Sequence, residues 1–99
     1  MSKDFIDKVK HLLSHGAIND PKQLDAIKGL NHSPIRLAVA KHPNTSQETL
    51  HYLAGDPNDS VRKEVVNNHN THQQTLQWMS ENDDHAYIKH VAKERLKPQ

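Results

Sequence analysis

The chain contains no cysteine. This absence excludes a disulfide scaffold, a zinc site built from thiolates and an iron–sulfur cluster held by cysteines. The sequence also lacks an N-terminal apolar run typical of a signal peptide, and no segment is long enough to cross a membrane as a helix. We therefore expect a cytoplasmic protein with no membrane partner.

The chain is also poor in apolar residues and carries little net charge. Hydrophobic residues make up 33% of the 99 residues, the mean hydropathy is −0.92 and the formal net charge is +1. So polar a composition leaves little material for a globular core, but the small net charge argues against a disordered chain. The near-neutral balance also gives little support to nucleic-acid binding, because domains that bind nucleic acid are usually strongly basic.

The apolar residues that are present recur periodically. The segment 35–54 resembles the segment 61–80, which lies 26 residues further along the chain. The same shift aligns four columns of apolar residues: Val9, Ile35, Val61 and Tyr87; Leu13, Val39, Val65 and Val91; Leu24, Leu50 and Leu76; Ile27, Leu53 and Met79. Such self-similarity is typical of repeats that bury their apolar stripes against their neighbours.

Capping and breaking signals divide each repeat into two helices. Asp20 and Ser33 each precede a proline at a predicted helix start, and Thr45 and Thr71 each open a predicted capping box. Pro43 ends a helix, because the residue before a proline is disfavoured in helical geometry. A repeat of 26 residues leaves room for a full α-helix as the second helix of each pair.

The sequence thus predicts an all-α protein that forms one domain over residues 1–99. Its architecture is a right-handed α-solenoid of about three 26-residue helix-pair repeats, with a closing C-terminal helix. The predicted repeats cover 9–34, 35–60 and 61–86, and a partial repeat covers 87–96.

Two stretches carry a resemblance to a known family. They read Asp56-Pro57-Asn58-Asp59-Ser60-Val61-Arg62-Lys63-Glu64-Val65-Val66, and Ile35-Arg36-Leu37-Ala38-Val39-Ala40-Lys41-His42-Pro43-Asn44-Thr45 followed by Leu50 and Leu53-Ala54. They resemble the variant leucine-rich repeat, a family of helical solenoids related in shape to HEAT repeats. The resemblance covers about residues 20–96 and implies a fold rather than an activity. One member of that family carries an iron–sulfur cluster, which needs cysteines that this chain lacks.

Basic residues recur beside the apolar columns. Arg36 and Arg62 share one column, Lys63 and Lys89 share the next, and Lys41 lies nearby on the same predicted face. A ridge of this kind could meet phosphate groups or an acidic partner. Alternatively, each arginine pairs with an acid of the turns between repeats, such as Asp56 or Asp59, and the lysines simply form a solvated helix face.

Two of the four aromatic residues are also aligned. Tyr52 and Trp78 share a column just beside the inward stripe. They could form a packed edge between repeats or an aromatic platform on a binding surface, since tyrosine and tryptophan are enriched at binding hot spots.

The nine histidines suggest one further possibility, a metal site. His11 and His15 are four residues apart, a spacing that can place two ligands on one helical face. We expect no Glu or Asp at a matching spacing to complete a ligand set, and Leu12 stands where the helical two-histidine zinc motif has its glutamate. We therefore predict no metal site and no cofactor.

No motif indicates catalysis. The serines lack a nucleophile elbow, and there is no glycine-rich phosphate loop. We therefore expect a non-enzymatic module that binds a protein partner, as an adaptor, inhibitor or immunity-type protein, and is a monomer or a weak homodimer. The candidate contact residues are Arg36, Lys41, Tyr52, Arg62, Lys63, Trp78 and Lys89. The alternative function is nucleic-acid binding through Arg36, Arg62, Lys63 and Lys89.

Overall fold

The computed structural model describes residues 2–98 as an all-α fold, with seven α-helices and no strand in that range. The helices are α1 (Lys3–Ser14), α2 (Pro21–Ile27), α3 (Ser33–Lys41), α4 (Gln47–Leu53), α5 (Asp59–Asn67), α6 (Gln73–Asn82) and α7 (Ala86–Leu96). None of them is both long and apolar enough to cross a membrane.

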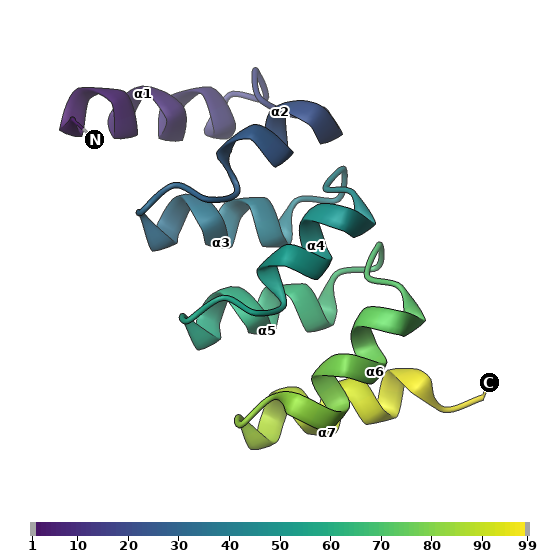
Figure 1. Cartoon of the computed structure of the whole chain (residues 1–99). Coiled ribbons are helices and arrows are strands. Elements are labelled where there is room, and N and C mark those ends of the chain that lie inside the picture. Colours follow the sequence, from purple (N-terminus) through teal and green to yellow (C-terminus); the bar gives the residue numbers. More distant parts are fainter. Residues whose placement is uncertain (1, 99) are drawn as a thin grey trace.

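The helices are arranged in two rows (Figure 1). The first row consists of α1, α3, α5 and α7, and the second row consists of α2, α4 and α6. The two ends of the chain lie at opposite ends of the stack, whose longest dimension is 43 Å. Neighbouring first-row helices contact one another, and each second-row helix packs on the first-row helix that follows it.

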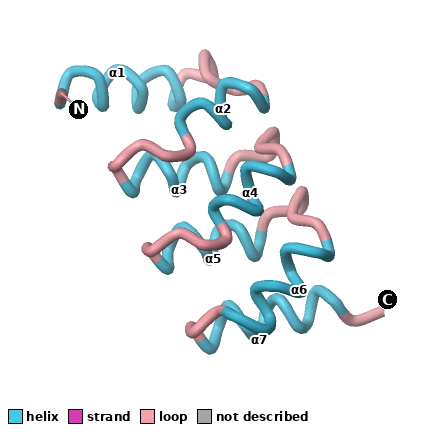
Figure 2. The backbone as a smooth tube through the Cα atoms, viewed as in Figure 1, coloured by secondary structure: helices cyan, strands magenta, loops and turns pink. Residues whose placement is uncertain are grey.

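Connecting loops lie along two opposite edges of the stack (Figure 2). We call the edge formed by loops 28–32, 54–58 and 83–85 the arginine edge, because the side chains of Arg36 and Arg62 bond to it. The edge formed by loops 15–20, 42–46 and 68–72 is the asparagine edge, after the amides described below.

Local capping explains several helix starts. The Asp20 carboxylate accepts from the backbone N–H of Gln23, whose side chain accepts in return from the Asp20 backbone, so this predicted cap is confirmed. The predicted caps at Thr45 and Thr71 are wrong by one residue, since Ser46 and His72 occupy the cap positions. Both threonines are buried and donate to backbone carbonyls instead, Thr45 to Val39 at 2.6 Å and Thr71 to Val65 at 2.7 Å.

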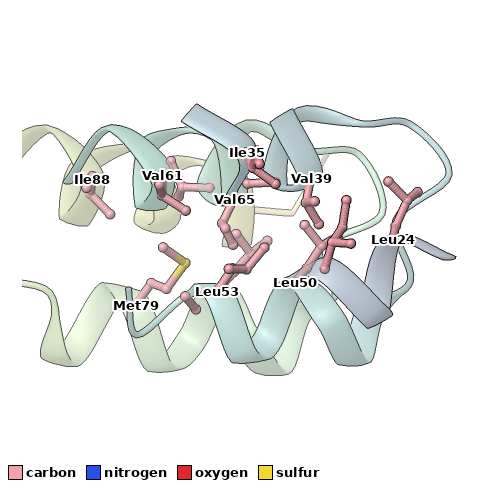
Figure 3. Close-up of a cluster of buried hydrophobic side chains, with 14 of the residues drawn as sticks. Leu24, Ile35, Val39, Leu50, Leu53, Val61, Val65, Met79 and Ile88 are labelled. Atoms are coloured by element: carbon pink, nitrogen blue, oxygen red, sulfur yellow. The ribbon is translucent and has the colours of Figure 1, made fainter. Parts of the chain in front are cut away.

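The hydrophobic core lies between the two rows (Figure 3). Side chains of the first row meet those of the second row there, and the labelled ones are Ile35, Val39, Val61, Val65 and Ile88 from the first row, and Leu24, Leu50, Leu53 and Met79 from the second. All nine are at most 1% exposed. Burying one such side chain contributes about 1.5–3 kcal/mol, so even this narrow stripe gives substantial stabilisation. The predicted columns are confirmed for these positions.

The last member of the first column departs from the prediction. Tyr87, which was expected in the core, is 47% exposed, and Ile88 is fully buried in its place. The reason is that α6 is three residues longer than α4 while the loop after it, 83–85, is two residues shorter than loop 54–58, so the corresponding positions of α5 and α7 are 27 residues apart rather than 26. A shift of one residue turns a helix by about 100°, which moves Tyr87 out of the interface.

Side-chain amides join successive loops on the asparagine edge. Asn68 Nδ2 donates to the carbonyls of Ala40, at 2.8 Å, and His42, at 3.0 Å. At the matching position of the last helix, Arg95 Nη1 donates to the carbonyls of Val66, at 2.8 Å, and Asn68, at 3.0 Å. These bonds satisfy carbonyls at helix ends, which have no partner within their own helix.

The one-residue shift at α7 can be tested with a neighbouring pair of substitutions. Ile88→Ala should lower the free energy of unfolding by about 2–5 kcal/mol, because it leaves a cavity in the core. Tyr87→Ala should lower it by less than about 1 kcal/mol, as is usual at exposed positions. Urea unfolding followed by circular dichroism measures both, and a larger loss for Tyr87→Ala would contradict the observed register.

Candidate functional site

Arg36 and Arg62 make matching contacts on the arginine edge, and Arg62 Nη2 also donates to Asp84 Oδ1 at 3.3 Å. Arg36 Nε donates to Asp56 Oδ2 at 2.8 Å and Nη2 donates to Oδ1 at 3.2 Å, while Nη1 donates to the Leu30 carbonyl at 3.0 Å. Arg62 repeats this with Asp83 at 2.9 and 3.4 Å, and with the Asp56 carbonyl at 2.8 Å. Each guanidinium therefore joins two successive loops, as the structural alternative predicted, but the bonded acids are Asp56 and Asp83 rather than Asp56 and Asp59.

Burial shields these two ion pairs from solvent and from a partner. The side chain of Arg62 is 13% exposed and that of Asp83 only 1%, and the Arg36–Asp56 pair is similarly covered. Hydrogen bonds to the carboxylates raise the pKa of Arg36 and of Arg62, against the opposing effect of burial. Both arginines therefore stay charged, and most of their donors already point at protein oxygens.

The lysines do not continue one ridge with these arginines. Lys41 lies at the end of α3, on the opposite, asparagine edge, where it lines a hollow together with His69. Lys63 is half-buried on α5, and Lys89 lines a separate hollow with Glu81 near the C-terminal end. The predicted cationic residues are thus divided among different parts of the surface.

Tyr52 and Trp78 lie on the second row, on α4 and α6, at equivalent positions of successive repeats. Tyr52 is 55% exposed and Trp78 is 42% exposed, although both are large aromatic residues. The Lys28 ammonium lies 5.2 Å from the centroid of the Tyr52 ring, within the range of a cation–π interaction. Arg36 and Tyr52 also line one hollow of about 310 Å³, so the structure brings these two candidate residues together.

A line of threonine contacts links the second-row helices. Thr49 Oγ1 donates to Asp25 Oδ1 on α2 at 2.7 Å, and at the matching position Thr75 Oγ1 lies 2.7 Å from His51 Nδ1 on α4. Gln47 adds a second connection, since its Oε1 accepts from the His72 N–H and its Nε2 donates to Thr75 Oγ1, both at 2.7 Å.

Thr75 is the meeting point of two bonds from α4. Its Oγ1 accepts from Gln47 Nε2 and shares a second bond with His51 Nδ1, at the position where Thr49 bonds to Asp25. The second-row helices, and with them Tyr52 and Trp78, are therefore held in register by bonds between side chains. These contacts were not predicted, although one signal for them is present, because threonine recurs at 49 and 75 with the 26-residue spacing.

Removing one arginine tests its structural role. Arg62→Gln should lower the free energy of unfolding by about 3–5 kcal/mol, because it leaves the carboxylate of Asp83 buried without its cation. The double variant Arg62→Gln/Asp83→Asn should recover part of this loss, since no unpaired charge is left.

The matched control for this substitution is Lys63→Gln. It removes an adjacent cation that forms no ion pair within residues 2–98, so the change should stay within about 0.5 kcal/mol. Urea unfolding measures all three variants. Equal stability of Arg62→Gln and Lys63→Gln would show that the ion pair does not hold the loops together.

The Asp25 carboxylate provides a test by pH. Its bond from Lys28, at 2.7 Å, and its bond from Thr49 lower the pKa of Asp25, whereas burial acts in the opposite direction. A lowered pKa in the folded state means that the stabilisation is fully present above the unfolded pKa of about 3.9 and is lost as the pH falls through the folded value. Asp25→Asn should therefore flatten the decline of melting temperature below about pH 4.

No protein-family model, curated protein or solved structure matches the chain. The resemblance to the variant leucine-rich repeat stays a prediction from the sequence. Any function must therefore be argued from the side chains themselves.

Proposed function

We propose that the chain is a non-catalytic binding module of the α-solenoid type, which recognises a protein partner through the exposed face of α4 and α6. The observation that carries this proposal is the alignment of Tyr52 and Trp78, which are both exposed at equivalent positions of successive repeats. Tyrosine and tryptophan supply a large apolar contact area together with a polar group, and they dominate the energy of many protein interfaces.

The surroundings of these rings favour a preformed surface. The threonine contacts fix α4 relative to α2 and α6, so the two aromatic residues are presented at a set spacing. A rigid surface loses little conformational entropy on binding, which raises affinity for a given contact area. In the proposed right-handed solenoid of about three helix pairs and a closing helix, equivalent positions form one extended face.

Nucleic-acid binding is the weaker candidate. Its predicted ridge depends on Arg36 and Arg62, whose guanidinium groups are bonded to Asp56 and Asp83. Lys63 and Lys89 remain, but the net charge of the chain is only +1. Phosphate contacts would make affinity fall with salt, at a log–log slope of about 0.9 per phosphate neutralised on duplex DNA.

Affinity capture from the source cells, followed by titration of the captured protein, tests the proposal. Tyr52→Ala and Trp78→Ala should each weaken binding at least about tenfold, since truncating a hot-spot residue costs about 2 kcal/mol or more. Tyr87→Ala is the matched control, because Tyr87 is also a half-exposed aromatic residue but lies on the first row.

Unchanged affinity in both second-row variants, with unchanged circular dichroism, would contradict the proposal. An equal loss in Tyr87→Ala would place the contact surface elsewhere. Retention on duplex DNA with a steep dependence on salt would favour the alternative function.

A further inference from the structure

A pair of histidines at the end of α1 is the strongest chemical feature outside the proposed binding face. His11 and His15 are both exposed, their ring centroids are 4.0 Å apart and the ring planes are inclined by 34°. From this pair we propose a surface site for a divalent transition-metal ion that prefers imidazole ligands, such as zinc(II), copper(II) or nickel(II). The site does not depend on the proposed protein-binding function.

The protonation state of one ring suits a metal ligand. His15 Nδ1 lies 2.9 Å from the backbone carbonyl oxygen of His11, and a carbonyl can only accept, so Nδ1 carries the proton. The neutral ring therefore has its lone pair on Nε2. Metal-binding histidines commonly donate their other N–H to a carbonyl in this way, which fixes both the tautomer and the ring orientation.

Ser14 reinforces this arrangement. Its hydroxyl donates to the same His11 carbonyl at 2.9 Å, and its oxygen lies 3.1 Å from His15 Nδ1. The ring of His15 is thus held by two neighbouring oxygens while its opposite nitrogen stays available.

One shared ion requires the two rings to move apart. Two imidazoles bound to one tetrahedral ion through nitrogens at 2.0–2.1 Å have ring centroids roughly 5 Å apart, about 1 Å more than the 4.0 Å between the His11 and His15 rings. Both side chains are on the surface, so a small rotation of either ring displaces no core residue. A hard ion such as magnesium(II) would not be selected, because it prefers oxygen ligands.

Protein ligands complete only part of the coordination sphere. Contrary to the sequence analysis, a carboxylate does lie in register, because Asp7 precedes His11 by one helical turn. However, no group of three histidine, aspartate or glutamate side chains gathers around a common point within residues 2–98. Water would therefore occupy the remaining positions, and the bound ion would exchange readily.

Binding would link the last two turns of an end helix. α1 lies at one end of the first row, where it contacts α3. An ion held by residues four apart favours the helical state over the unfolded state, because only the helix brings both ligands together. The ion should consequently raise the melting temperature.

Titration with zinc chloride, followed by calorimetry and by NMR of the histidine rings, tests the site. We expect one ion per chain at the tightest step, with the ring resonances of His11 and His15 shifting first. His11→Gln and His15→Gln should each weaken that step at least tenfold and abolish the rise in melting temperature.

The matched control is His69→Gln, since His69 is an exposed histidine in loop 68–72. It should leave the tightest step and the rise in melting temperature unchanged. The proposal is overturned if His11 and His15 do not respond before the other histidines, or if the His69 variant loses as much affinity as the α1 variants.

Discussion

The contacts of Asp56 are the point on which the stacking of this chain depends. Its carboxylate accepts two bonds from Arg36, its backbone carbonyl accepts one from Arg62, and it also bonds the N–H of Asn58 at the start of α5. One residue of loop 54–58 thereby connects α3, which carries Arg36, with α5, which carries Arg62. The geometry of a bidentate arginine–carboxylate pair is directional, so it sets the angle between units as well as their attraction.

Directional bonds of this kind explain how so polar a chain forms an ordered fold. The core is a stripe between two rows of short helices, and apolar burial alone is non-directional. The arginine edge and the asparagine edge hold the two sides of that stripe, and the threonine contacts hold the second row. Because these bonds link the second-row helices directly, Tyr52 and Trp78 can remain on the surface without contributing to the core.

The sequence predicts the parts of this structure that depend on periodicity. The burial of residues such as Val39 and Leu53 is predicted correctly, because a buried position stays apolar each time the sequence pattern recurs. The prediction that Tyr87 is buried is wrong because the repeat length changes from 26 to 27 residues before α7. The extra residue lies in α6 and the loop after it, and it becomes visible only in the structure. The partner of an arginine cannot be read from spacing, since Arg62 bonds across 21 residues to Asp83. The exposure of Trp78 likewise depended on packing that no local pattern reveals.

The side-chain bonds that join successive loops on the asparagine edge share one direction along the chain. Asn44 bonds back to Asn19, Asn70 bonds back to Thr45, and Arg95 bonds back to Val66. In each case the donor belongs to the later segment and the acceptor to the earlier one. Chains are synthesised from the N-terminus, so every acceptor carbonyl already exists when its donor leaves the ribosome. On this edge, assembly can therefore proceed unit by unit in the order of translation, with no donor waiting for a segment still to be made.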